Sequence, residues 1–185
     1  MDEAMANQPR VAKVLVALLV SMTLGAVVLM ALGNNPPQGG AFCLSSYYSL
    51  DPVRDAMASR AAQTPGRWNS IEIYYSGTQV GNIEQLASLR GMASPDQLNC
   101  HFCLCNGSGG LDGQIQTTER WQKQWSAVQD AKWQGTNKTI RICVIADGTS
   151  KLPTDCQVKR AETLAEQLSR NLNIMPDAAY YPNNW

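Results

Sequence analysis

A run of 19 residues without a charge, residues 14–32, divides this chain into two unlike parts. As a helix the run would span roughly 28 Å, close to the hydrocarbon thickness of a bilayer. Arg10 and Lys13 precede it, and the next basic residue is Arg54. Because basic residues resist translocation, the pattern predicts a cytoplasmic N-terminus over residues 1–13 and a transmembrane anchor over residues 14–33.

The rest of the chain is then expected on the extracytoplasmic, periplasmic side of the cytoplasmic membrane, as a single-pass protein in contact with lipid through residues 14–32. A cleaved signal peptide is the alternative, with Ala31-Leu32-Gly33 as a weak cleavage site. The apolar run is longer than the usual signal-peptide core of about 7–15 residues, which favours the uncleaved anchor. Both interpretations export the domain that follows.

The charge balance bears on the kind of partner, and the cysteine content bears on the cellular compartment. Fifteen basic and fifteen acidic residues cancel, so the composition gives no sign of a nucleic-acid partner. Six cysteines would meet an oxidising compartment after export, so disulfides are expected, although sequence order does not identify the pairs. The six are Cys43, Cys100, Cys103, Cys105, Cys143 and Cys156.

Residues 34–66 form a spacer and a helical lead-in. Residues 34–40 are rich in turn formers, and Asp51-Pro52 predicts a helix through about residue 62, with Asp51 as N-cap. In residues 67–185, strand patterns alternate with helix patterns, which favours an α/β fold with a mixed central sheet flanked by helices. The expected strands cover residues 70–75, 99–106, 114–118 and 139–146, and the last of these is apolar on both faces, which places it centrally.

Capping signals mark two helices of this domain. Asn82 is the expected N-cap of a helix over residues 82–89, with Gln85 at the capping-box position. Thr154 and Gln157 form a second capping box in front of a long helix. On that helix apolar residues recur at three- and four-residue steps and mark the buried face: Val158, Ala161, Leu164, Ala165, Leu168 and Leu172.

Four short motifs lie in the first half of the domain. They read Ile71-Glu72-Ile73-Tyr74-Tyr75-Ser76, Cys100-His101-Phe102-Cys103-Leu104-Cys105-Asn106-Gly107, Gly110-Leu111-Asp112-Gly113 and Arg120-Trp121. In order and spacing they resemble the zinc-dependent N-acetylmuramoyl-L-alanine amidases, whose fold is shared with peptidoglycan recognition proteins and phage T7-type lysozymes. The resemblance covers residues 67–185 and implies a mixed sheet flanked by helices, with peptidoglycan as the ligand.

The family's zinc site is not retained by the matching positions. The resemblance implies one zinc held by three protein ligands with one open position. The first ligand position carries Tyr74, the second falls near Pro182, and the third falls beyond Trp185. The position of a catalytic tyrosine carries Cys100, and that of an active-site histidine carries Val128. We therefore expect no catalytic residue, no metal ligand and no zinc cofactor, which makes the domain a pseudoenzyme.

The chain has one histidine, so any other metal site would have to use thiolates. Cys100 and Cys103, with Cys105, have the spacing of a zinc ribbon. If their segment is a strand, however, Cys100 points to one face while His101, Cys103 and Cys105 point to the other. Disulfides or apolar packing are then favoured for the cysteines, and a packed, hydrogen-bonded role for His101.

Binding is the function that such a domain can retain. By analogy with the family, Tyr74 and Tyr75 lie on the floor of the substrate groove, flanked by Arg120 and Trp121. Aromatic faces suit sugar rings, and an arginine can pair with the carboxylates of a peptide stem. The alternative is that the tyrosines only fill the space of the lost metal site.

The sequence thus predicts a membrane-anchored, extracytoplasmic, amidase-like domain that has lost zinc catalysis and acts as a peptidoglycan-binding or scaffold module of the cell envelope. Two alternatives stay open. One is an accessory or structural subunit of a membrane protein complex, whose partners are other membrane or envelope proteins. The other is an active N-acetylmuramoyl-L-alanine amidase with unconventional ligands.

Overall fold

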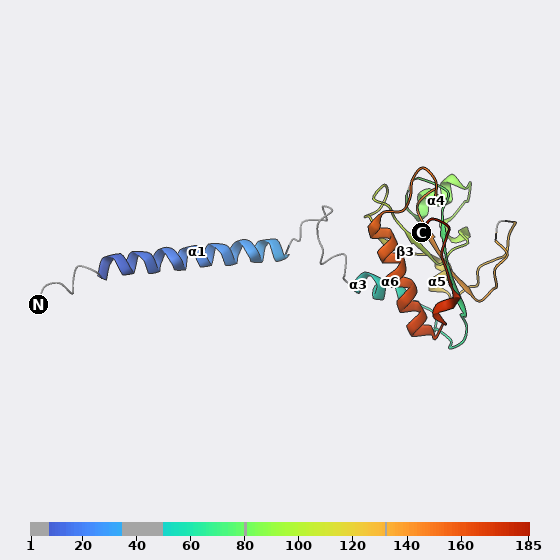
Figure 1. Cartoon of the computed structure of the whole chain (residues 1–185), viewed down its shortest axis with the longest axis horizontal. Helices are drawn as coiled ribbons and strands as arrows, with labels where there is room; N and C mark the ends of the chain where they lie inside the picture. The colour runs from blue at the N-terminus through green and yellow to red at the C-terminus, as the bar shows by residue number, and fades with distance from the viewer. Residues whose placement is uncertain (1–7, 35–49, 80, 132) are drawn as a thin grey trace, which may run out of the picture. The chain divides into compact units, whose positions relative to one another are not determined.

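The computed structural model describes residues 8–34, 50–79, 81–131 and 133–185, and the chain divides into two compact units, Met1–Ser46 and Tyr47–Trp185. In the first unit, residues 8–34 form one helix, α1 (Gln8–Asn34), which is drawn in blue in Figure 1. Apolar side chains such as Val14 and Leu18 are exposed along it. Across the described part of the chain, no helix combines the length and apolarity that crossing a membrane requires.

The second unit is built on a five-stranded mixed sheet with the order β3-β2-β4-β1-β5. Its strands β2, β4, β1 and β5 run parallel, and β3 is antiparallel to β2. As predicted from its apolar character, β4 is the central strand, and all six of its residues are buried. The strands are β1 (Ser70–Tyr75), β2 (Phe102–Leu104), β3 (Ile115–Thr117), β4 (Thr139–Val144) and β5 (Ala179–Tyr180).

Helices cover both faces of the sheet. The chain passes from β1 to β2 through α4 (Ile83–Leu89) and, in the opposite direction, from β4 to β5 through α6 (Asp155–Leu172). Right-handed crossovers in opposite directions place these two helices on opposite faces. Figure 1 shows α6 in orange, and α3 (Asp51–Met57) contacts it. The expected fold class, an α/β domain with a mixed sheet flanked by helices, is therefore present.

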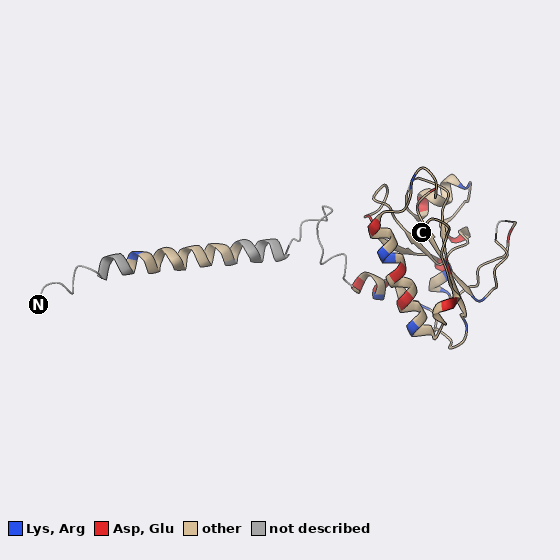
Figure 2. Ribbon diagram, viewed as in Figure 1, with Lys and Arg blue, Asp and Glu red and all other residues tan. Residues whose placement is uncertain are grey.

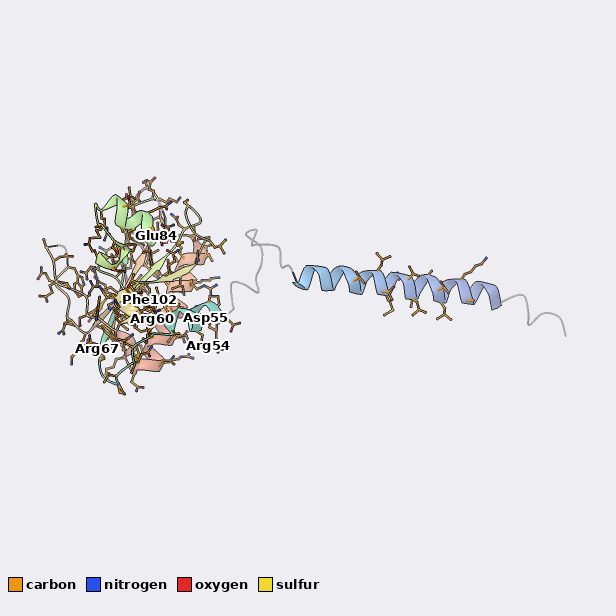
Figure 3. The ribbon with its side chains drawn as sticks, turned by 180° about the vertical axis from the view of Figure 1, so that it is seen from behind. Arg54, Asp55, Arg60, Arg67, Glu84 and Phe102 are labelled. Carbon is orange, nitrogen blue, oxygen red and sulfur yellow. The ribbon has the colours of Figure 1, made fainter. Side chains whose placement is uncertain are left out.

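Two hydrophobic cores correspond to the two faces. The larger core contains the apolar face of α6, in which Ala161, Leu164 and Leu168 are buried, and Phe102, which lies inside the domain (Figure 3). Acidic and basic residues both occur along α6 (Figure 2), as expected of an amphipathic helix with one apolar face. The smaller core packs α4 against the cysteines of β2 and β4.

Both predicted helix caps of the domain are present. Asn82 accepts a hydrogen bond from the amide of Gln85 at the start of α4, and α4 ends at Leu89. At the start of α6, Thr154 and Gln157 form the complete capping box. These local signals were readable because they depend on residues three apart in the chain.

The helix predicted over residues 51–62 ends earlier, at Met57, and Asp51 is its first residue rather than its N-cap. The helix ends early because a backbone amide after Met57 bonds a carbonyl outside the helix. The amide of Ala61 donates to the carbonyl of Gln122, the last residue of α5 (Glu119–Gln122), at 2.9 Å instead of continuing the helical ladder. A tertiary hydrogen bond thus replaces a local one.

The predicted strand over residues 99–106 is also shorter, because the chain is irregular at Cys100 and His101. The amide of His101 donates to the carbonyl of Arg141, but the amide of Arg141 donates to the imidazole Nδ1 of His101 at 2.9 Å. The imidazole of His101 thus takes the place of the backbone carbonyl that would accept this hydrogen bond in a regular ladder. The predicted alternation of faces is wrong here: Cys100 and Cys103 share the α4 face, while His101 lies on the opposite face.

We expect Thr154→Ala to lower the free energy of unfolding by about 1–2 kcal/mol, because it removes the acceptor for the Gln157 amide. Urea unfolding of the full chain, followed by tryptophan fluorescence, measures this change. Thr163→Ala on the same helix is the control, since its hydroxyl bonds only its own helix and should change stability by less than about 0.5 kcal/mol. Equal effects in both variants would contradict a stabilising role for the cap.

Candidate functional site

The position that resembles the family's first zinc ligand, Tyr74, lies on the α4 face in the middle of the sheet. Its neighbour on β4 is Cys143. The ring is half-buried, whereas the hydroxyl is fully buried and has no nitrogen or oxygen partner within the described residues. The residue packs against the cluster that contains Cys100. Burial raises the pKa of the Tyr74 phenol well above its usual value of 10, so the phenol stays neutral.

A buried arginine holds the ring of Tyr74 in place. The guanidinium carbon of Arg141 lies 4.2 Å from the centre of the Tyr74 ring and 4.4 Å from that of Trp133. Its Nε donates to the Glu72 carboxylate at 2.8 Å, and its Nη1 donates to the carbonyl of Asn99 at 2.8 Å. The arginine is therefore fully used within the protein, as a cation between two aromatic faces with one carboxylate as its counter-ion.

Three thiols form the wall behind Tyr74. Cys100, Cys103 and Cys143 are all fully buried in the smaller core. Cys143 is the register partner of Cys103 in the β2–β4 ladder. The interaction with the Cys143 thiol and burial raise the pKa of the Cys100 thiol well above its usual value of 9. Since the thiolate is the metal-binding form, these neutral thiols make a poor ligand set at physiological pH.

The five cysteines from Cys100 to Cys156 are free thiols, and Cys43 lies outside the described residues. The disulfides expected after export are thus not found among these five. Within the same described residues, no three histidine, cysteine, aspartate or glutamate side chains are arranged to hold a metal ion.

His101 is fully buried and uses both ring nitrogens. Nδ1 accepts from the amide of Arg141, which assigns the proton to Nε2, and Nε2 donates to the carbonyl of Trp125 at 3.0 Å. The rings of Trp68 and Trp121 pack edge-on against the imidazole. Burial lowers its pKa from 6.5 to about 3. The residue is a packed, hydrogen-bonded histidine, as expected, and at neutral pH its acceptor nitrogen is not available as a base.

The four predicted groove residues do not come together. Tyr75 points to the face opposite Tyr74, where it stacks on Trp185 and donates to the carbonyl of Asn184. Trp121 is fully buried in the larger core. The guanidinium of Arg120 donates to the carbonyls of Leu98 and Ser126 and so fixes two loops. Neighbouring strand residues alternate between faces, which explains why the two tyrosines separate.

The other family positions are also scattered. Cys100 lies beside Tyr74, as described above. Val128 is exposed on a loop, where its amide donates to the side chain of Asn99 at 2.8 Å. Pro182 lies in the segment after β5, in which the neighbouring Tyr181 packs against Trp185.

Sequence reasoning missed the residues that surround Tyr74. Arg141 was visible as the one charged residue in the apolar run Thr139-Ile140-Arg141-Ile142-Cys143-Val144, and a charge in a central strand requires partners. Glu72, two residues before Tyr74 on the same face, was the natural candidate. Tyr180, which is 59% exposed, pairs with Glu72 in the β1–β5 register. No local signal pointed to Trp133, because it reaches Arg141 from a loop.

No protein-family model and no curated protein matches the chain. Among solved structures, the fold is similar to that of the N-acetylmuramyl-L-alanine amidase AmiD from E. coli, determined in complex with its substrate anhydro-N-acetylmuramic acid-L-Ala-D-gamma-Glu-L-Lys. The TM-score is 0.43 with 17% sequence identity, and the match covers 66% of this chain and 51% of the amidase. This chain thus spans about half the length of that protein, and a likeness at this level assigns no residue a role.

The burial of His101 predicts a loss of stability in mild acid. The unfolded histidine takes up a proton below pH about 6.5, whereas the folded one stays neutral down to about pH 3. The unfolded state therefore binds more protons in this window, so stability falls as the pH falls, by about 2 kcal/mol between pH 7 and pH 5. Urea unfolding over this range, compared with His101→Asn, isolates the histidine. An unchanged pH slope in the variant would contradict the assignment.

The buried Tyr74 hydroxyl predicts different results for two substitutions. Tyr74→Phe keeps the ring under Arg141 and removes an unpartnered polar group, so the free energy of unfolding should change by less than about 1 kcal/mol. Tyr74→Ala removes the ring and should cost roughly 2–4 kcal/mol. Urea unfolding distinguishes them. A loss above about 2 kcal/mol in Tyr74→Phe would show that the hydroxyl has a strong partner.

Proposed function

We propose that this chain is a membrane-anchored, extracytoplasmic, amidase-like module that has no zinc catalysis and binds peptidoglycan as a structural part of the cell envelope. The observation that carries the non-catalytic half of the proposal is the state of Tyr74. A zinc hydrolase needs ligands with available lone pairs around an open coordination position. At the corresponding place this chain has a neutral phenol, its hydroxyl facing inward and its ring covered by Arg141.

Two further titratable groups, His101 and Glu72, support the same conclusion. A hydrolase needs a base whose pKa lies near the working pH and which reaches the substrate. The one histidine of the chain is buried, with a pKa of about 3. Glu72 is committed to Arg141 by an ion pair of 2.8 Å. Neither group is free to activate a water molecule.

A surface on the α4 side of the sheet supports the binding half. Tyr180 presents an exposed ring at the edge of the sheet, beside Glu72, and Tyr74 lies two residues further along β1. An exposed aromatic face next to a carboxylate suits a pyranose ring, which offers C–H groups to the aromatic face and hydroxyl donors to the carboxylate. We call Glu72, Tyr74 and Tyr180 the edge surface. It replaces the groove of Tyr74, Tyr75, Arg120 and Trp121 as the proposed glycan contact.

The membrane location belongs to the proposal as well. It is supported by the uncharged run over residues 14–32, by the basic residues that precede this run, and by the exposed apolar side chains along α1. The N-terminus would then be cytoplasmic and the domain periplasmic.

The test is cosedimentation of the detergent-solubilised full chain with purified insoluble peptidoglycan. We expect saturable binding that Tyr180→Ala weakens roughly five- to tenfold, equivalent to about 1–1.4 kcal/mol for one aromatic contact. Leu152→Ala is the matched control, because Leu152 is exposed at a comparable 54% but lies outside the edge surface. Binding of the control should equal that of the wild type.

Other outcomes would replace the proposal. Absence of binding above that of an unrelated exported protein would exclude a wall-binding role, and stable copurification of other membrane proteins would then favour the accessory subunit. Release of peptide from peptidoglycan by the zinc-loaded chain, abolished by a chelator, would overturn the loss of catalysis.

A further inference from the structure

Strand β3 forms one edge of the sheet. It stands first in the strand order β3-β2-β4-β1-β5, so within the described residues it has a paired neighbour, β2, on one side only. An edge strand presents backbone donors and acceptors that can pair with another extended chain. The function proposed above makes no use of this edge.

The hydrogen bonds between β2 and β3 show which backbone groups of β3 face outward. The amide of Thr118 and the carbonyl of Gln114, which flank β3, bond the residues that flank β2, both at 3.0 Å. Bonded and non-bonded positions alternate in an antiparallel pair, so Ile115 and Thr117 are the non-bonded positions of β3. Their N–H and C=O groups therefore point away from β2, and no hydrogen bond from another described residue reaches them. The edge thus offers two donors and two acceptors.

A groove of about 460 Å³ lies along this edge, and we call it the β3 groove. All three residues of β3 line it, together with residues of α4 and of the short helix η1 (Pro95–Gln97). The side chain of Gln116 accepts a hydrogen bond from the amide of Ile83 at 2.9 Å, which holds the start of α4 beside the strand. The outward backbone groups of β3 therefore face an open groove on the α4 side of the sheet.

The β3 groove is acidic. Its charged lining residues are Glu84, Asp96 and Glu119, and no lysine or arginine of the described chain lines it. Glu119 is paired with Arg60 and Lys123. Glu84, labelled in Figure 3, and Asp96 are exposed and form no ion pair with a described residue. The groove therefore favours a cationic occupant and disfavours a second copy of the same edge, which would bring like charges together.

We propose that the edge of β3 binds an extended, basic segment of a partner protein, which adds to the sheet as a further strand antiparallel to β3. Main-chain hydrogen bonds to Ile115 and Thr117 would supply affinity, and alternate side chains would supply specificity. Directly opposite residues of an antiparallel pair share a face. Ile115 packs against the larger core, so the residues opposite Ile115 and Thr117 would point to the α6 face. The alternate residues would point to the α4 face, towards Glu84 and Asp96, and are expected to be lysine or arginine.

The test uses the full chain in detergent and a dye-labelled synthetic peptide of alternating lysine and valine, with binding read by fluorescence anisotropy. We expect saturable binding, which Glu84→Gln combined with Asp96→Asn should weaken roughly three- to tenfold. Glu166→Gln combined with Asp177→Asn is the matched control, because it removes the same charge from exposed positions outside the groove. This control should bind as the wild type does. A peptide of alternating glutamate and valine should not bind.

Methylation of the peptide backbone tests strand addition itself. In the proposed register the valine amides face β3 and the lysine amides face away from it. N-methylation of the valines should therefore abolish binding, whereas N-methylation of the lysines should change affinity by less than about threefold.

Four results would overturn the proposal. They are absence of binding by the lysine peptide, equal binding of the glutamate peptide, equal losses from the two methylations, and a dimer of the chain that the lysine peptide dissociates. The last result would identify a second copy as the occupant. Because the assay contains no peptidoglycan, none of these results depends on glycan binding.

Discussion

The buried guanidinium of Arg141 is the constraint on which much of this domain depends. It lies in the central strand, where its side chain is only 8% exposed, and an uncompensated charge at such a place would cost several kcal/mol. Compensation comes from Glu72, the carbonyl of Asn99 and the two aromatic rings that enclose it. These partners come from three segments, so the arginine ties β1, the lead-in to β2 and the loop of Trp133 to the central strand.

The backbone of the same residue determines how β2 begins. The Arg141 amide is satisfied by the imidazole of His101 rather than by a strand carbonyl, and His101 must be neutral to accept that hydrogen bond. This irregularity turns His101 towards Trp68 and Trp121 and leaves Cys100 on the same face as Cys103 and Cys143. The packed histidine and the thiol cluster are thus two results of one departure from regular strand geometry.

The parts of the fold that were predictable from sequence are those with short-range signals. The caps at Asn82 and Thr154 depend on residues three positions apart, and the buried character of β4 depends on its own composition. The failures have a different physical origin. The early end of α3 at Met57 and the position of Cys100 are decided by hydrogen bonds to Gln122 and Arg141, which are distant in sequence. The predicted groove failed because Arg120 and Trp121 were placed by analogy, whereas here they hold loops and fill the larger core.

Most of the buried polar side chains described above already have hydrogen-bond partners within the protein, and this favours binding over catalysis. A catalytic site keeps some polar groups incompletely paired, because they must be free to interact with a reacting molecule. In this domain the opposite holds: beside Tyr74, Arg141 and Glu72 are paired with each other, and on the opposite face both ring nitrogens of His101 are bonded to the backbone. The inward hydroxyl of Tyr74 faces thiols rather than an open space. The exposed groups on this side of the sheet are the ring of Tyr180 and the partly exposed carboxylate of Glu72, which can contact a ligand without transforming it.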